Sequence, residues 1–160
     1  MVTYDEVGAT AGTLPAGYHH VRRSAVLGSG VATFARTAEA LMTWEVQRRS
    51  GLRVRCSSPR AAVGVTMASG IGLGPLRLWA PCEVVAVVEE PRRRGFVYGT
   101  LPGHPARGEE SFTVVHEADD RVVLHIVAFS KPANLLFALG APLSRRVQAF
   151  VTRRYLRALV

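Results

Sequence analysis

A run of short apolar segments between Leu76 and Phe129 limits the fold of this chain more than any other feature. Proline, glycine or aspartate separates one segment from the next, and the last two segments are apolar on both faces. The clearest pair is Ser111–Glu117 and Arg121–Phe129, joined by Ala118-Asp119-Asp120, a spacing typical of a β-hairpin. Because short turns join neighbouring antiparallel strands, the run predicts an antiparallel sheet.

Further strands are expected on both sides of this hairpin. Pro81 leaves two alternatives open for residues 76 to 88, either two strands or one strand bent at the proline. The other segments with strand character are Ser24–Gly30, Leu52–Cys56, Ala61–Met67 and Gly95–Leu101.

Helical periodicity occurs in two places. After Val31, the apolar residues Phe34, Ala38 and Leu41 follow helical spacing, which predicts one helix to about Arg49. After Ser130-Lys131-Pro132 the chain reads as a long helical tail, and a second helix is expected to begin near Pro142, after Gly140. The apolar stripe of this tail is expected to pack on the sheet and consists of Leu136, Leu139, Leu143, Val147, Phe150 and Val151.

The order is therefore a strand, a helix, about six further strands and a long C-terminal helix. We predict an α+β helix-grip fold, in which a curved antiparallel sheet of about six to seven strands wraps around the C-terminal helix. A length of 160 residues suits a single domain over residues 1–160, in which residues 1–17 form an N-terminal arm.

Composition excludes several classes of protein. No charge-free run approaches the ~20 residues of a membrane-spanning helix, and the first thirty residues lack the apolar core of a signal peptide. The two cysteines, Cys56 and Cys82, are expected to be reduced thiols in a cytoplasmic protein. No histidine, cysteine or carboxylate set has metal-ligand spacing, so neither a metal nor a cofactor is expected. The net charge of +8 favours anionic partners or surfaces.

The stretch from Phe96 to Glu110 has the densest set of ionisable side chains in the chain. Its glycines and prolines predict a stiff loop that could hold His104 near Tyr98 or Glu110, a set suited to acid–base chemistry. The alternative is structural. In that case Glu109 and Glu110 accept backbone N–H bonds that lock the loop, and His104 packs against a proline.

Several motifs resemble a family without a settled activity. They include Gly17-Tyr-His-His20, Tyr98-Gly-Thr-Leu-Pro-Gly-His-Pro105, Gly108-Glu-Glu110 and Ala128-Phe-Ser-Lys-Pro132. Over Gly17–Leu159 the chain is similar to domain of unknown function 1990, also called uncharacterised protein family 0548, of bacteria and plants. The resemblance implies the helix-grip fold of the birch-allergen/START-like superfamily, whose members often enclose an apolar cavity. Within the family's most recognisable motif it marks Tyr98, Gly103, His104, Gly108 and Glu110.

The leading functional hypothesis is a protein that binds a small, largely apolar molecule between its sheet and its C-terminal helix. Tyr98 and His125 are the expected polar anchors, although a lone histidine on an apolar strand face is more often a core residue. The candidate lining residues are Trp79, Phe96, Tyr98, Phe112, His125, Phe129 and Leu139.

Two alternatives stay open. One is a cofactor-free cyclase, isomerase or hydrolase acting on a polyketide-like or lipid-like molecule. Its catalytic residues would be Tyr98 and His104, with Glu110 orienting His104. The weaker one is a polyanion- or protein-binding module that uses the arginine face of the last helix. Nucleic acid is a poor fit because the chain has no nucleic-acid fold motif. The oligomeric state stays undetermined.

Overall fold

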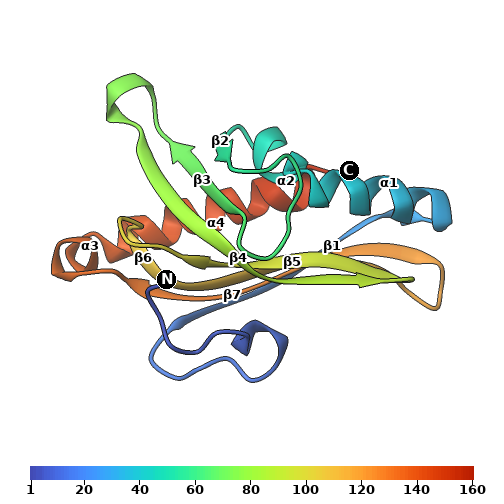
Figure 1. Cartoon of the computed structure of the whole chain (residues 1–160), viewed down its shortest axis with the longest axis horizontal. Coiled ribbons are helices and arrows are strands. Elements are labelled where there is room, and N and C mark those ends of the chain that lie inside the picture. The colour runs from blue at the N-terminus through green and yellow to red at the C-terminus, as the bar shows by residue number, and fades with distance from the viewer.

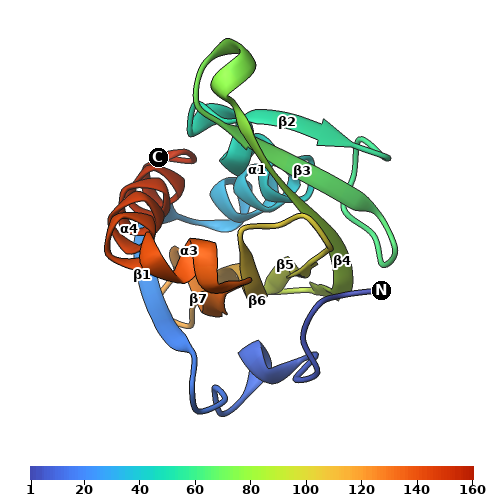
Figure 2. The same ribbon diagram turned by 90° about the vertical axis from the view of Figure 1, so that its left-hand side faces the viewer.

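Seven antiparallel strands form one sheet in the order β1-β7-β6-β5-β4-β3-β2. The structure is a computed structural model that describes residues 1–160 (Figure 1). The long strands β4 to β7 form the body of the sheet, and the short β2 and β3 curl over one end of it (Figure 2). The strands are β1 (His19–Ser29), β2 (Arg53–Cys56), β3 (Thr66–Ile71), β4 (Leu78–Glu90), β5 (Arg93–Thr100), β6 (Ala106–His116) and β7 (Arg121–Pro132).

All four α-helices lie on the concave side of this sheet (Figure 2). They are α1 (Val31–Met42), α2 (Glu45–Arg49), α3 (Leu135–Leu139) and α4 (Ala141–Arg157), and two short 3₁₀ turns are η1 (Ala9–Ala11) and η2 (Gly74–Leu76). The curved sheet around a C-terminal helix confirms the predicted α+β helix-grip class. None of the helices has the length and hydrophobicity needed to cross a lipid bilayer.

The predicted hairpin of β6 and β7 is confirmed, but β6 is longer than the sequence indicated. It begins at Ala106 instead of Ser111, so that Glu109 and Glu110 lie in a strand and not in a loop. Adjacent residues of a strand face opposite sides of the sheet, so the two carboxylates enter different environments.

The helix predicted from Val31 to Arg49 is interrupted at Trp44. This residue adopts a left-handed conformation, with φ of 68°, and separates α1 from α2. The kink directs the indole ring into the core, where it packs edge-on against Phe96 at 5.1 Å and its Nε1–H donates to Ser58 O at 3.0 Å. Burial of a large ring and a satisfied indole N–H offset the cost of the left-handed residue.

The strand predicted at Ala61–Met67 is displaced along the chain. Residues 61 to 65 form a turn, with Gly64 at a φ of 85°, and β3 spans Thr66–Ile71 instead. The uncertainty at Pro81 resolves as one continuous strand, β4, in which the proline lies opposite Ala68.

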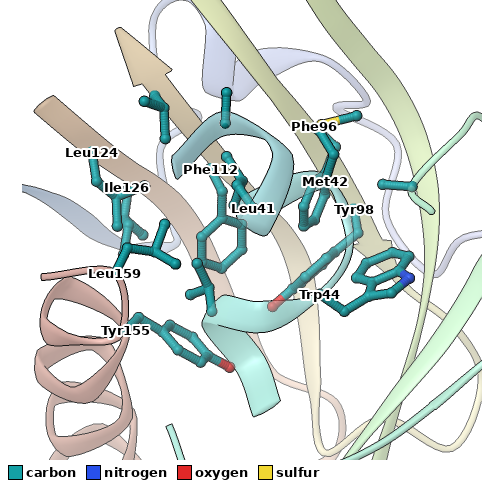
Figure 3. Packing of buried hydrophobic residues seen from close by; sticks show 14 of the residues in the cluster. Leu41, Met42, Trp44, Phe96, Tyr98, Phe112, Leu124, Ile126, Tyr155 and Leu159 are labelled. Carbon is teal, nitrogen blue, oxygen red and sulfur yellow. The ribbon is translucent and has the colours of Figure 1, made fainter. Parts of the chain in front are cut away.

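A single apolar core lies between α1, α2, the sheet and the last turns of α4 (Figure 3). Phe112 at its centre contacts Phe96 at 5.5 Å and meets Tyr155 of α4 edge-on at 5.4 Å. Other fully buried members are Leu41, Met42, Trp44, Leu124 and Ile126.

The C-terminal tail begins a second helix after Gly140, as predicted, but most of its predicted apolar stripe does not pack on the sheet. Thr152, Tyr155 and Leu159 are buried, so only the last turns of the tail are held in the core. Within the stripe, Leu136, Leu139 and Leu143 are mostly exposed. The first turns of α4 therefore do not seal the concave face of the sheet.

Candidate functional site

A pocket of about 850 Å³ occupies the space between the concave face of the sheet and α4. Inward-facing residues of the strands form one wall, among them Ser69, Ala80, Cys82, Tyr98 and Ala128. Residues of α4 form the other wall, among them Val147, Val151, Thr152 and Tyr155.

Tyr98 and Glu110 form the polar centre of the pocket. They are opposite each other in the register of β5 and β6, and the Tyr98 hydroxyl donates to Glu110 Oε2 at 2.8 Å. No arginine, lysine or histidine forms an ion pair with Glu110. Burial without a cation raises the pKa of the Glu110 carboxyl to about 7, although the bond from Tyr98 opposes the shift. Glu110 can therefore hold or release a proton near neutral pH.

The phenols and the thiol around this pair are uncharged at neutral pH. Burial, together with the nearby Glu110 carboxyl, raises the pKa of Tyr98, of Tyr155 and of the Cys82 thiol. In Figure 3, Tyr98 comes from the sheet and Tyr155 from α4, so the pocket is bordered by phenols from both walls. These hydroxyls can donate hydrogen bonds but are too weakly acidic to serve as anions.

His104, in the loop between β5 and β6, lines the pocket but forms no hydrogen bond with Glu110. Its Nδ1 accepts the Ala106 N–H at 2.9 Å, and burial lowers the pKa of the ring to about 4. The ring is therefore neutral at physiological pH, and its proton is on Nε2. Sequence reasoning joined His104 to Glu110, whereas the structure joins Glu110 to Tyr98 and His104 to the backbone.

Glu109 lies on the opposite face of the sheet and holds the N-terminal segment there. Its carboxylate accepts the Tyr4 hydroxyl at 2.7 Å, the Gly8 N–H at 2.7 Å, and the Thr10 N–H and hydroxyl at 3.1 and 2.6 Å. Figure 2 shows this segment on the side of β6 and β7 that faces away from α4. The structural alternative for the glutamate pair thus fits Glu109, while Glu110 belongs to the pocket.

Three predicted ligand-binding aromatics have their rings outside the pocket. Phe96 and Phe112 are buried in the packed core beside it. Phe129 borders the pocket, but its ring packs edge-on against Tyr4 and Tyr18, at 5.7 and 5.0 Å, on the outer face. Phe129 pairs with Glu109, so the same alternation that turns Glu109 outward also turns Phe129 outward.

Three other predicted residues also lie away from the pocket. The His125 side chain is 41% exposed and lies 3.6 Å from Glu117, on the outer face of β7. Trp79 lies beneath the guanidinium of Arg55, 3.9 Å from the ring centre. Leu139 is exposed on α3. Tyr98 is thus the one member of the predicted set whose side chain faces the pocket.

Sequence reasoning missed the helix residues of the site. Thr152 and Tyr155 line the pocket, but the predicted apolar stripe included only more hydrophobic residues near them in the sequence. Their three-residue spacing places them on one face of α4, and that spacing was the available signal.

Basic residues are also part of the pocket lining. They are His19, Lys131 and Arg145, and burial and the nearby Arg145 lower the pKa of His19. No cluster of three or more histidine, cysteine, aspartate or glutamate side chains is placed to hold a metal ion.

Comparison with known families identifies the chain. The sequence model of a domain of unknown function, DUF1990, matches residues 3–158. The chain belongs to the DUF1990 family. A UPF0548 protein of Deinococcus radiodurans is 33% identical over 96% of this chain and 80% of its own length. A UPF0548 protein of Arabidopsis thaliana is 29% identical over 84% of this chain and 68% of its own length.

Solved structures share the fold of this DUF1990 protein at low sequence identity. A hypothetical protein of Helicobacter pylori superposes with a TM-score of 0.72 at 10% identity, covering 100% of this chain and 97% of its own. A major latex-like protein of Panax ginseng gives 0.55 at 13% identity, covering 89% and 98%. A norcoclaurine synthase point mutant of Thalictrum, in complex with a transition-state analogue, gives 0.51 at 12% identity, covering 89% and 97%. These matches establish the birch-allergen/START-like helix-grip fold.

Proposed function

We propose that this protein binds a small, largely apolar molecule in the pocket between its sheet and α4. The observation that carries the proposal is the pocket itself, about 850 Å³ with Tyr98 and Glu110 on its wall. This volume lies within the range of roughly 300–1,000 Å³ that is usual for small-molecule sites. The norcoclaurine synthase of the same fold, seen in complex with an analogue, supports the use of this scaffold for small molecules.

Aliphatic and aromatic side chains would provide most of the binding free energy. Leu78, Val147 and Val151 line the pocket, and each Å² of apolar surface removed from water contributes roughly 25 cal/mol. The Tyr98–Glu110 pair would orient the polar end of the molecule. When ionised, the carboxylate of Glu110 accepts a hydrogen bond from the ligand, and when protonated it can donate one.

Native mass spectrometry of freshly purified protein tests the proposal, followed by extraction of any molecule that co-purifies. We expect a discrete added mass that is lost from the Ala80→Phe variant, because Ala80 is an inward-facing residue of β4 and a phenyl ring there fills the pocket. The matched control is Ala68→Phe, which adds the same ring to the other face of the neighbouring strand.

The two variants separate binding in the pocket from binding elsewhere. A ligand retained equally by Ala80→Phe and Ala68→Phe would place the molecule outside the pocket. If the wild-type protein carries no added mass, screening apolar carboxylic acids, amines and phenols by thermal shift decides the matter. The proposal would be overturned if no class of compound raised the melting temperature of the wild-type protein by more than it raised that of Ala80→Phe.

The second candidate is acid–base catalysis on the bound molecule, as in a cofactor-free cyclase, isomerase or hydrolase acting on a polyketide-like or lipid-like substrate. The observation that favours it is a carboxyl with a pKa of about 7 joined to the Tyr98 phenol within a pocket. In this case Glu110 is the base and Tyr98 a hydrogen-bond donor to developing negative charge. Neutral His104 is a second possible donor.

Turnover of the identified ligand distinguishes the two candidates. Because general-base catalysis contributes typically 10²–10⁴-fold, Glu110→Gln is expected to lower turnover at least about 100-fold while the added mass is retained. A His104→Gln variant is expected to have a smaller effect, since the ring is not the base. Unchanged turnover in Glu110→Gln would exclude this candidate and leave ligand binding intact.

A further inference from the structure

Two exposed leucine-rich segments flank the open end of the pocket. The first is the turn between β3 and β4, where Leu73 and Leu76 are 83% and 88% exposed. The second is α3 with the first turn of α4, where the exposed residues are Leu135, Leu136, Leu139 and Leu143. We call these six leucines the apolar rim. Exposed large apolar side chains grouped in this way mark an interaction site on an otherwise polar protein.

Both segments belong to the same end of the molecule and continue into the pocket. In Figure 1 the β3–β4 turn and α3 project from the left-hand end, which Figure 2 turns toward the viewer. Ile71 and Leu78, on either side of the β3–β4 turn, line the pocket, and so do Phe137 and Leu143 on the helical side. A molecule leaving the pocket at this end would therefore pass between apolar surfaces.

Cations predominate in the two chain segments that carry the apolar rim. Residues 131–160 contain Lys131, Arg145, Arg146, Arg153, Arg154 and Arg157 but no aspartate or glutamate, although the whole chain has 12 acidic residues. Arg77 in the β3–β4 turn adds a further cation, and residues 66–82 also lack an acid. Arg77, Arg145 and Arg146 form no ion pair. Lys131 instead lies over the Tyr18 ring and helps to lower the pKa of Glu6, while Arg154 and Arg157 belong to the last turn of α4, away from the rim. The leucines of the rim therefore have arginines without carboxylate partners nearby.

We propose that this end of the protein docks on the surface of an anionic lipid bilayer. Leucines on two separate projections can enter the boundary between head groups and acyl chains, while arginines nearby bind lipid phosphates and carboxylates. A second copy of this chain fits less well, because it would bring two patches of the same charge together. A nucleic acid would satisfy the arginines but would leave the leucines in water. The docking surface shares Leu143 with the pocket lining but does not depend on the proposed ligand.

Sedimentation with lipid vesicles tests the proposal. The probes are vesicles of phosphatidylcholine containing about 30% phosphatidylserine, compared with vesicles of phosphatidylcholine alone. We expect at least about tenfold tighter binding to the anionic vesicles in low salt, and a marked loss of binding near 0.5 M salt, where screening shortens the range of the charge.

Leucine variants separate insertion from charge attraction alone. We expect the double variants Leu73→Ser/Leu76→Ser and Leu136→Ser/Leu139→Ser each to weaken vesicle binding at least about tenfold, because each removes two apolar side chains from the contact. The matched control is Val31→Ser. Val31 is 70% exposed and is the first residue of α1, at the opposite end of the molecule (Figure 1). The Val31→Ser variant should therefore bind vesicles as the wild type does. Circular dichroism checks that every variant is folded.

Three results would overturn the proposal. The first is vesicle binding that is absent, or unchanged in both leucine variants. The second is a dimer in light scattering that the same variants dissociate, which would show that a second copy covers the rim. The third is binding to a short RNA that survives both leucine variants and exceeds binding to anionic vesicles. The Ala80→Phe variant should keep vesicle binding, so a failure of the pocket proposal remains separate from a failure of this one.

Discussion

Glu109 and Glu110 show how one step along a strand changes the role of a side chain. Both are glutamates of β6, and strand geometry sends the first outward and the second inward. Glu109 meets four hydrogen-bond donors from the N-terminal segment, whereas Glu110 meets one phenol and an apolar pocket. The first carboxylate is therefore structural, and the second is available for a ligand.

Burial of the Glu110 carboxyl should make the free energy of unfolding depend on pH. Its pKa of about 7 in the folded protein exceeds the ordinary value of 4.5, so the folded state binds the proton more tightly than the unfolded state does. Stability contributed by this group is full below pH 4.5 and is lost as the pH rises through 7. We expect Glu110→Gln to be more stable than the wild type by about 1–3 kcal/mol at pH 8 and nearly equal to it at pH 4.

Urea denaturation at the two pH values measures this difference. The matched control is Glu90→Gln, at an exposed position at the end of β4, which should change stability little at either pH. If Glu110→Gln changed the free energy of unfolding equally at pH 4 and pH 8, the raised pKa of Glu110 would be contradicted. A substitution that acts only through packing has the same effect whether or not the carboxyl is protonated.

At the scale of elements, the N-terminal segment is part of the fold and not a free arm. Besides the bonds to Glu109, Thr3 N–H donates to Thr100 O at 3.0 Å. Gly99 allows this packing, because a Cβ at that position would collide with the ring and hydroxyl of Tyr4. The first glycine of the Tyr-Gly-Thr-Leu-Pro-Gly-His-Pro motif therefore leaves room for the N-terminal segment to pack on the sheet.

Removing the charge of Glu109 should release this segment. In Glu109→Gln, the new amide N–H₂ faces N–H and O–H donors that need an acceptor, and a buried donor is left unsatisfied. We expect a loss of about 1–3 kcal/mol in the free energy of unfolding, together with faster hydrogen exchange in residues 3–10. Urea denaturation and hydrogen-exchange mass spectrometry measure the two effects.

A tyrosine change provides the control for this prediction. Tyr18 donates one hydrogen bond, at 2.8 Å, to the half-buried Glu6, whereas Glu109 accepts four, so Tyr18→Phe should cost much less than Glu109→Gln. Unchanged exchange of residues 3–10 in Glu109→Gln would mean that packing of Tyr4 on Phe129, and not the carboxylate, holds the segment in place.

The C-terminal helix combines two functions along its length. Its last turns are held by Tyr155 in the core and by Arg154, whose Nε donates to Ser50 O at 2.6 Å. Its first turns line the pocket and expose Leu143. A helix with a uniform apolar stripe can therefore be structural at one end and leave an open site at the other.

At the scale of the whole molecule, packing and charge are both polarised. The fully packed core lies between α1, α2 and the last turns of α4, and the pocket lies under its first turns. All of the acidic residues precede residue 121, whereas the C-terminal segment is purely cationic. Of the arginines of this segment, Arg145 and Arg146 are in the first turns of α4, close in the chain to the exposed leucines.

The sequence by itself determined the class of fold, because hydrophobic periodicity and turn composition are local properties. The hairpin of β6 and β7, the short strand at Arg53–Cys56 and the second helix after Gly140 all follow from them. The cluster of ionisable residues between Phe96 and Glu110 also put Tyr98 and Glu110 in one candidate site, although the sequence predicted a loop there and the structure joins them across paired strands.

Tertiary structure alone decided which residues form the site. Three features depend on packing against residues distant in the sequence, which no local pattern encodes. They are the break at Trp44, the single strand through Pro81 and the exposed first turns of α4. The same dependence placed His125 and Trp79 outside the pocket and brought Thr152 and Tyr155 into it. Hydrophobicity predicts that a side chain will be buried, but only the packed structure determines whether it is buried in a core, beneath another segment or at a site.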